Sequence, residues 1–321
     1  MIMSAAAESE TEGMPMQCCA SCGVAEIDDI KLKDCDDCDL VKYCSDECQE
    51  DHRPQHKEDC KKRAAELRDE ILFKQPESTH LGDCPICCLP IPIDPSKSTL
   101  YSCCCKRICQ GCSIANKRRE IEGRREPKCP FCRKVSPSTE GEINEFLMKR
   151  VEANDPVAMC SMGKKKYQEG DYKSAFEYAT RVVALGDTEA YYQLGHVEAH
   201  YGLSVLYNEG EGVEKDENKE LYHLKEAAIG GHPEARHNLG CTEEENGRLD
   251  RALKHWIIAA KLGFDTSLEV VKNLYKAGFA SKDDFTKALR GYQTAIEAAK
   301  SPQREEAAKF AKWEAEHNPL L

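Results

Sequence analysis

The sequence lacks any long apolar run. Only 40% of its 321 residues are hydrophobic and 32% are charged, and no uncharged segment approaches the roughly 20 residues that a membrane-spanning helix needs. The first 13 residues are small and acidic, without the basic region and apolar core of a secretory signal. We therefore expect no membrane association and an intracellular protein, either cytoplasmic or nuclear.

Basic charge and enzyme motifs are also scarce. The chain has 57 acidic against 45 basic residues, a net charge of −12, which argues against broad neutralisation of nucleic-acid phosphates. It contains neither a GxSxG nucleophile motif nor a P-loop. Nucleic acid is therefore not an expected partner, and neither a serine hydrolase nor a nucleotide-driven enzyme is indicated.

Cysteine, in contrast, is abundant. Eighteen of the twenty cysteines lie between Cys18 and Cys132, in a region too poor in apolar residues to build a large core. In a reducing compartment such a pattern is typical of metal sites rather than of disulfides. Because ligation energy becomes folding energy in small domains, we expect zinc to hold this region together.

The first cluster contains eight ligands of the right types for two zinc ions. They occur as four pairs: Cys19-x2-Cys22, Cys35-x2-Cys38, Cys44-x3-Cys48 and His56-x3-Cys60. The last two pairs have the i, i+4 spacing that lies on one face of a helix. Cys18 is an alternative to Cys19, and His52 is an alternative to His56, but the spacing favours Cys19 and His56.

This cluster closely resembles the MYND zinc finger, above all in residues 43–49 (Tyr-Cys-Ser-Asp-Glu-Cys-Gln) and 56–60 (His-Lys-Glu-Asp-Cys). The resemblance implies short helices that carry the last four ligands, and two interleaved sites. One site would be Cys19, Cys22, Cys44 and Cys48, and the other Cys35, Cys38, His56 and Cys60. Where this chain has His52, the family often has tryptophan. MYND fingers usually bind short proline-containing peptides; a purely structural zinc knot is the alternative.

The second cluster has a different spacing. It comprises Cys84-Pro-Ile-Cys87, the triplet Cys103, Cys104 and Cys105, the pair Cys109 and Cys112, and Cys129-Pro-Phe-Cys132. It resembles an all-cysteine, divergent RING finger. The resemblance implies one zinc bound by Cys84, Cys87, Cys109 and Cys112, and another bound by Cys129 and Cys132 with two of the triplet. Spacing alone does not choose between the three, and Cys88 is expected to be a spectator.

The RING resemblance also implies an activity. RING fingers hold a ubiquitin-charged E2 enzyme beside a substrate and act by positioning, without a covalent intermediate. Residues Ile86, Pro130 and Arg133 match the positions that contact E2 in this family. The chain is thus a candidate E3 ubiquitin transferase, with an E2 enzyme and a substrate peptide as partners. The alternative is a degenerate RING that serves only as a zinc-dependent scaffold for protein binding.

The C-terminal half repeats itself. A pattern Ala-x3-[Leu/Met]-[Gly/Ser] begins at Ala158, Ala190, Ala199 and Ala235, and units end at Gly186, Gly230 and Gly263. The recurrence of such units along the chain predicts a solenoid of packed helix pairs. Two of the starts are only nine residues apart, a local duplication that either lengthens one helix or adds a short turn. Ahead of the repeats, Thr139 with Glu142 predicts a capping box and a helix.

Residues 203–216 (Leu-Ser-Val-Leu-Tyr-Asn-Glu-Gly-Glu-Gly-Val-Glu-Lys-Asp) resemble a Sel1-like repeat, a relative of the tetratricopeptide repeat. We expect further helices over 268–277 and 282–298, and a capping helix over 303–316. Five histidines of this region fall at no repeated ligand spacing and are assigned structural or surface roles: His196, His200, His223, His232 and His237.

The predicted fold class is therefore small zinc modules followed by an all-α, Sel1-like solenoid. The expected organisation is a disordered tail (1–17), a MYND finger (18–60), a helix and linker (61–83), a RING-like finger (84–133), a linker helix (134–154), Sel1-like repeats (155–300), and a capping helix and tail (301–321). The repeats are expected to select the partners.

Overall fold

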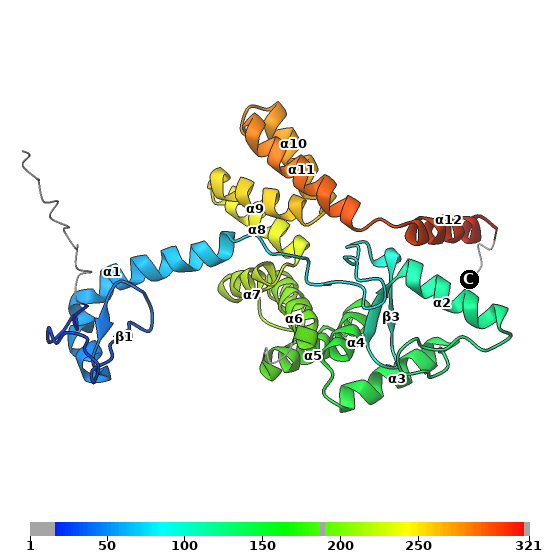
Figure 1. Ribbon diagram of the computed structural model, residues 1–321, viewed down its shortest axis with the longest axis horizontal. Coiled ribbons are helices and arrows are strands. Elements are labelled where there is room, and N and C mark those ends of the chain that lie inside the picture. The colour runs from blue at the N-terminus through cyan, green and yellow to red at the C-terminus, as the bar shows by residue number, and fades with distance from the viewer. Residues whose placement is uncertain (1–16, 187–189, 318–321) are drawn as a thin grey trace, which may run out of the picture. The chain divides into compact units, whose positions relative to one another are not determined.

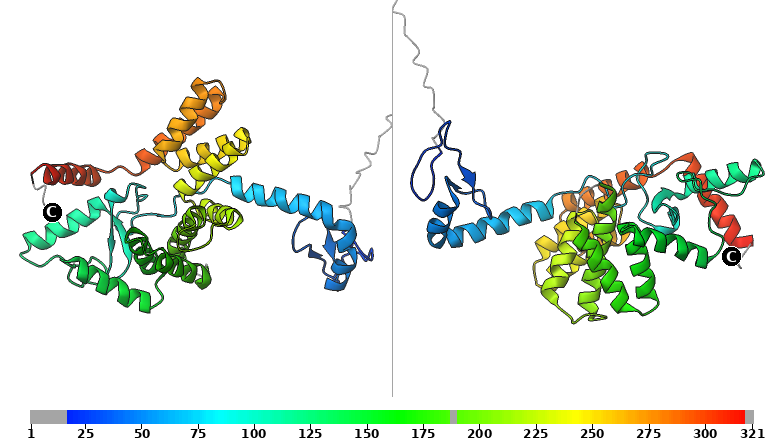
Figure 2. Two further views of the ribbon diagram at one scale, coloured as in Figure 1. Left: turned by 180° about the vertical axis from the view of Figure 1, so that it is seen from behind. Right: turned by 90° about the horizontal axis from the view of Figure 1, so that it is seen from below.

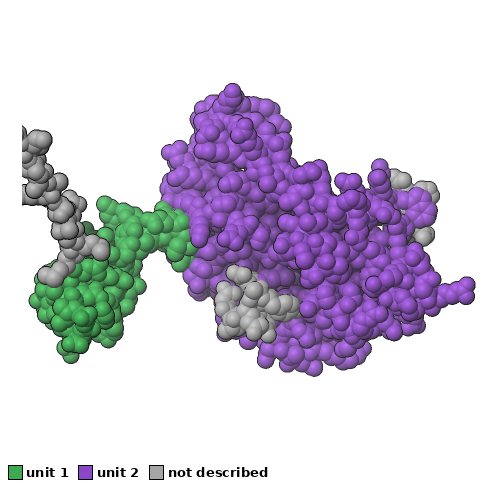
Figure 3. Space-filling model, in the orientation of Figure 1, with its two compact units in different colours: residues 1–72 green, residues 73–321 purple. Residues whose placement is uncertain are grey.

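The computed structural model describes residues 17–186 and 190–317, and the side chains of residues 17–186 and 194–313. Most of the expected N-terminal tail, the residues 187–189 ahead of Ala190 and the last four residues lie outside this part. The chain divides into two compact units, Met1–Leu72 and Phe73–Leu321 (Figure 3).

The first unit is a small hairpin and a long helix. Strands β1 (Lys33–Asp34) and β2 (Lys42–Tyr43) pair antiparallel, and α1 runs from Asp46 to Phe73. The buried core consists of three cysteines with Leu32 and Tyr43. So few large apolar side chains cannot hold this unit, in keeping with the expectation that metal does.

Helix α1 differs from the expectation of short ligand-bearing helices followed by a separate helix within residues 61–83. It is one continuous helix of 28 residues that includes Pro54, and Cys44 lies just ahead of it. No glycine or proline lies between Cys60 and Phe73, so the ligand-bearing turns and the segment after Cys60 form one helix. Pro54 removes one backbone donor but does not end the helix.

The second cysteine cluster also folds around a hairpin. A short 3-10 helix (Pro95–Lys97) leads into β3 (Ser98–Tyr101), which pairs antiparallel with β4 (Lys106–Cys109), and α2 (Gln110–Glu122) follows directly. The core consists of five cysteines with Ile91, Tyr101 and Ile108. We call residues 84–133 the second module.

The rest of the chain is helical, which confirms the predicted all-α region. The helices are α3 (Glu140–Glu152), α4 (Pro156–Gln168), α5 (Tyr172–Leu185), α6 (Ala190–Glu209), α7 (Glu217–Ile229), α8 (Pro233–Glu245), α9 (Leu249–Lys261), α10 (Asp265–Lys276), α11 (Lys282–Ala298) and α12 (Pro302–His317). From α3 to α11 each helix packs against its neighbour in sequence (Figures 1 and 2). Within the described residues, no helix combines the length and apolarity needed to cross a membrane.

Local signals fix several helix ends as predicted. Thr139 and Glu142 form the expected capping box at the start of α3, and their side chains satisfy two backbone donors. Gly186 follows α5 with a φ of 72°, and Gly263 follows α9 with a φ of 94°. Only glycine adopts these angles without strain, which explains the glycine at the end of these two units.

The duplicated motif lengthens one helix. Both starts, at Ala190 and Ala199, lie within α6, which has 20 residues where the other repeat helices have 12 to 17. The structure thus chooses the first of the two alternatives that the sequence left open.

Glycines of the repeated motif lie where helices meet most closely. A Cβ atom at Gly195 would lie 2.8 Å from Pro156 Cβ, and one at Gly240 would lie 2.4 Å from Trp256 Nε1. Trp256 itself is 1% exposed and packs in the core of this region. The glycines of the motif therefore allow close helix packing.

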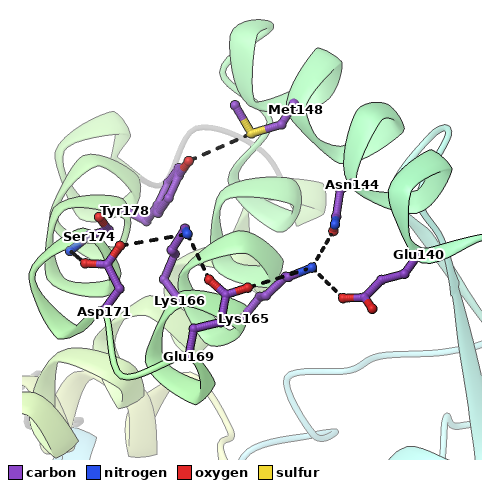
Figure 4. Close-up of polar contacts among 9 residues, drawn as sticks. All are labelled: Glu140, Asn144, Met148, Lys165, Lys166, Glu169, Asp171, Ser174 and Tyr178. Atoms are coloured by element: carbon purple, nitrogen blue, oxygen red, sulfur yellow. Dashed lines mark hydrogen bonds and ion pairs between the residues drawn. The ribbon is translucent and has the colours of Figure 1, made fainter.

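Polar contacts join α3 to the first repeat pair (Figure 4). Lys165 Nζ donates to Glu140 Oε1 at 2.5 Å and to Asn144 Oδ1 at 3.0 Å, both on α3. Because Glu140 is exposed, we assign this ion pair little stability. The buried side chains Leu147 and Val151 of α3, packed with Val157 and Met159 of α4, do more to hold the helix.

The last helix differs from the expected cap of the repeat array. Helix α12 packs against α2 of the second module (Figure 1). Arg118 of α2 donates to Glu306 at 2.5 Å and lies 4.9 Å from the centre of the Phe310 ring. These contacts join α12 to the second module.

Substituting the motif glycines tests this packing. Gly240→Ala should destabilise the protein by about 1–3 kcal/mol, because its new methyl group overlaps Trp256. The matched control is Gly202→Ala in α6, where nothing lies within 4 Å of the added Cβ. This control should be neutral or stabilising by about 0.5–1 kcal/mol. Urea denaturation measures both; equal effects would contradict the packing role.

Candidate metal centres

Four groups of four side chains converge in the two cysteine clusters. They are Cys19, Cys22, Cys44 and Cys48; Cys35, Cys38, His56 and Cys60; Cys84, Cys87, Cys109 and Cys112; and Cys103, Cys104, Cys129 and Cys132. In each group the ligand atoms lie within 4.8 Å of one another. All twenty cysteines lie in the described residues, and none forms a disulfide.

In the first unit, the segment ahead of the hairpin, the hairpin itself and α1 supply the ligands together. Cys22 Sγ lies 3.5 Å from Cys44 Sγ, which in turn lies 3.6 Å from Cys48 Sγ on the first turn of α1. In the other group, Cys38 Sγ lies 3.1 Å from His56 Nε2, and Cys35 Sγ lies 3.8 Å from Cys60 Sγ. These are the two interleaved sets that the MYND resemblance implied.

The two alternatives for this cluster lie elsewhere. Cys18 is exposed and belongs to none of the four groups. His52 Nδ1 lies 3.0 Å from the hydroxyl of Tyr43, and its ring stacks on His56 with centroids 5.7 Å apart. His52 thus packs beside His56, which is the residue that the spacing favours as ligand.

In the second module, the four pairs alternate along the chain. The first pair meets the third, with Cys87 Sγ 3.8 Å from Cys109 Sγ. The second meets the fourth, with Cys104 Sγ 3.6 Å from Cys129 Sγ and Cys132 Sγ 3.3 Å from Cys103 Sγ. This alternation is a cross-brace.

The structure separates the cysteine triplet. Cys103 and Cys104 join Cys129 and Cys132, whereas Cys105 is 1% exposed and packs in the core formed with helices α3 to α6. Its φ of 53° turns the chain at this point. Burial raises the pKa of the Cys105 thiol to about 12, with a contribution from the charge of Asp155. Cys105 therefore behaves as a core side chain.

Backbone amides stabilise the thiolate form of the first cysteine in each cluster. Burial raises the pKa of Cys19, but N–H groups of Cys22, Cys44 and Ser21 lower it more, to about 6. Burial likewise opposes a net fall of the Cys84 pKa to about 7, caused by N–H groups of Cys109, Cys87 and Ile86. The thiolate is the form that binds metal.

The donors and distances fit zinc. A zinc–sulfur bond of about 2.3 Å in a tetrahedron places sulfur atoms about 3.8 Å apart, whereas a disulfide needs about 2.05 Å. The sulfur pairs here lie 3.3 to 3.8 Å apart. Each group provides a full set of four soft ligands, as structural zinc sites do.

Arg304 of α12 lies against one of these groups. Its guanidinium donates to the carbonyls of Pro90 and Leu89 at 2.7 and 3.0 Å, and to Cys87 Sγ at 3.3 Å. Gln303 Nε2 donates to the carbonyl of Gly111 at 3.2 Å. Four thiolates around a dication carry a net negative charge, so the Arg304 cation also complements the site electrostatically.

The three residues that the RING resemblance assigns to E2 contact lie at the surface of the second module. Ile86 is 44% exposed, and Pro130 is half-buried between Cys129 and Cys132. Arg133 donates to Glu120 at 3.3 Å, while Arg125 donates to the same carboxylate at 2.8 Å. The Arg125 guanidinium, with Arg133, holds the pKa of Glu120 below its usual value.

Comparison with known proteins agrees with this geometry. The family model of the MYND finger matches residues 19–60, so the first cluster is a MYND finger, as predicted, and implies zinc. No curated protein matches the chain.

Solved structures with Sel1-like repeats are structural neighbours. A Sel1 repeat protein from Oxalobacter formigenes aligns with a TM-score of 0.41 and 22% identity, over 59% of this chain and 72% of that one. A protective antigen of uropathogenic Escherichia coli strains, which displays an SLR fold, aligns with a TM-score of 0.37 and 19% identity, over 63% of this chain and 41% of that one.

A pair of adjacent serine substitutions tests the ligand assignment. Cys104→Ser should lower the zinc content by up to one ion per chain, because a hydroxyl is a poor zinc ligand. Cys105→Ser should leave the zinc content unchanged. Native mass spectrometry counts the bound ions directly. A loss of zinc from the Cys105 variant alone would reverse the assignment.

Proposed function

We propose that this chain is a zinc-dependent adaptor for protein binding whose second module acts as a RING-type E3 ubiquitin ligase. The observation that carries the proposal is the cross-brace, in which Cys84, Cys87, Cys109 and Cys112 alternate with Cys103, Cys104, Cys129 and Cys132. A hairpin and a helix lie between the ligand pairs of this cross-brace. The zinc ions would fix the loops that present the contact residues.

The residues of the chain would act by positioning. Ile86 offers an exposed apolar side chain between two ligands of the first site, and Pro130 lies between two ligands of the second. An E2 enzyme that contacts both of these ligand-bearing loops is held in one orientation. Orientation is sufficient for this chemistry, because the reacting thioester and lysine belong to the partners.

Arg133 would be the residue that contacts E2 and ubiquitin together. Its side chain is 54% exposed, and its guanidinium is oriented by Glu120, which is 1% exposed. The buried carboxylate already restricts the conformations of the exposed arginine. Less conformational entropy is therefore lost when the arginine binds a partner. Glu120 is thus a positioning residue in this proposal.

The MYND finger and the repeats would supply the other contacts. Both kinds of module are protein-interaction modules, so we assign partner selection to the repeats and peptide binding to the MYND finger. We place this activity in a reducing compartment, cytoplasmic or nuclear, where the thiols stay available for zinc.

One observation favours a second candidate function, a non-catalytic scaffold. Helix α12 packs along α2 and contacts Cys87 and Leu89 through Arg304, so part of the second module is already covered by the chain itself. If this coverage extends to the surface that an E2 needs, the module serves only protein binding.

Ubiquitin discharge from a charged E2 enzyme separates the two candidates. Ile86→Ala should slow discharge roughly tenfold or more, because a buried isoleucine contributes about 1.5–3 kcal/mol to an interface. Ile143→Ala is the matched control, since Ile143 is similarly exposed at 39% but lies on α3. Zinc content should be unchanged in both variants.

The ligase proposal predicts fast discharge by the natural protein and by the Ile143 variant. Absence of discharge by the natural protein across a broad panel of E2 enzymes would contradict it and leave the scaffold function.

A further inference from the structure

A fifth group of metal-ligand type lies outside both cysteine clusters. Its members are His80, from the segment ahead of the second module, Glu198, from the middle of α6, and His232, the residue immediately before α8. One ligand atom from each lies within 4.8 Å of the other two. The chain brings together residues more than a hundred positions apart, which local sequence alone does not do.

The two imidazoles are well removed from solvent, and the carboxylate is partly exposed. The His80 side chain is 5% exposed and His232 is 5% exposed, whereas 35% of the Glu198 side chain remains accessible. All three line a cavity of about 360 Å³ between α4, α6 and the start of α8. The rest of its wall is largely apolar, with Leu81, Val157 and Leu194 among its lining residues. A carboxylate and two imidazoles are thus grouped beside an apolar cavity.

A hydrogen bond already joins two members of this group. His80 Nε2 lies 2.9 Å from Glu198 Oε1, and since an ionised carboxylate accepts, this nitrogen carries the proton. A metal ion shared by the two side chains would bind at the same two atoms and take the place of this proton. His80 Nδ1, on the other side of the ring, is buried and has no hydrogen-bond partner within the described residues.

Ring packing holds the two histidines in place. The His80 and His232 rings stack with centroids 4.4 Å apart and an interplanar angle of 13°. Tyr201 stacks on His232 with centroids 4.1 Å apart. The lone pair of an imidazole nitrogen lies in the plane of its ring, so one ring must turn out of this stack before both nitrogens face the same ion. Metal binding would therefore replace the ring stack with coordination.

We propose that His80, Glu198 and His232 form a fifth metal site, which binds a divalent transition-metal ion such as zinc. Two imidazoles and one carboxylate are a ligand set that such ions take. Three protein ligands leave at least one coordination position for water or another molecule, unlike the four closed groups of the cysteine clusters. The adjoining cavity gives a small ligand room beside that position.

The site would also fasten the segment ahead of the second module to the repeats. This segment already lies against the turn before α8, where His80 N donates to the carbonyl of Gly231 at 3.2 Å. A Cβ atom at Gly231 would lie 2.7 Å from the Ser78 carbonyl oxygen, so only glycine fits there. A metal bridging His80 to Glu198 and His232 would add covalent-like links across the same contact.

Two features set the affinity below that of the cysteine sites. His232 Nδ1 accepts a long hydrogen bond of 3.3 Å from Ala235 N and so caps α8. A metal bound at Nε2 would take the place of the proton on that nitrogen. If the proton moves to Nδ1, this nitrogen no longer accepts from Ala235 N and the cap is lost. Arg107 lines the same cavity, and its positive charge opposes a cation. We therefore expect the fifth ion to bind only after the four cysteine groups are filled.

Zinc counting at increasing free zinc tests the proposal on the full chain. Native mass spectrometry should show one more ion in the natural protein than in Glu198→Ala or His80→Ala at the same free zinc. The matched control is His223→Ala. His223 lies with its Nδ1 2.9 Å from His200 Nδ1 but belongs to no ligand group in the described residues, so its removal should not change the count.

The zinc held by the cysteine groups serves as the internal check on folding. A variant that keeps those ions and its helical circular dichroism while losing one ion supports the site. Equal zinc counts in the natural protein and both triad variants overturn it. Loss of an ion from the His223 variant as well would equally overturn the assignment to these three residues.

Discussion

Tetrahedral coordination of sulfur and nitrogen at fixed distances is the constraint on which the N-terminal half of this molecule depends. The hairpin β1–β2 has two residues per strand and that of β3–β4 has four, too little for independent stability in water. Each hairpin is held to the neighbouring helix and loops by sets of four ligands that come from separate segments of the chain. Because the sets interleave, neither site can form without the chain closing around the other. Zinc binding and folding would therefore be one event in each cluster.

The repeat region rests on a different principle. Small residues such as Gly195 and Gly240 let helices approach closely, and side chains such as Trp256 fill the space between them. This region needs no metal for its core. The two principles meet at Cys105, which leaves the ligand set and enters the core with Leu147 and Met159. Of the three consecutive cysteines, two belong to a ligand group and the third packs in the helical core. Cys105 thereby joins the second module to the helices.

Much of this was predictable, since ligand spacing is a local signal. Pairs such as Cys84 with Cys87 and the box of Thr139 with Glu142 are readable from a few neighbouring residues. The choice among Cys103, Cys104 and Cys105 was not, because it depends on which side chain meets α3 and α4. The same holds for α12, whose Arg304 finds Cys87 far away in sequence. His80 and His232 likewise share no spacing, and only the fold brings them together.

The central claim is that metal holds the two cysteine clusters and apolar packing holds the repeats. Hydrogen exchange of the full chain, with zinc bound and after removal of zinc by a chelator, tests it most directly. Amides of residues 19–60 and 84–133 should lose protection after chelation, while those of α5 and of α7–α11 keep most of theirs. Unchanged protection in the clusters, or equal loss along the whole chain, would contradict the account.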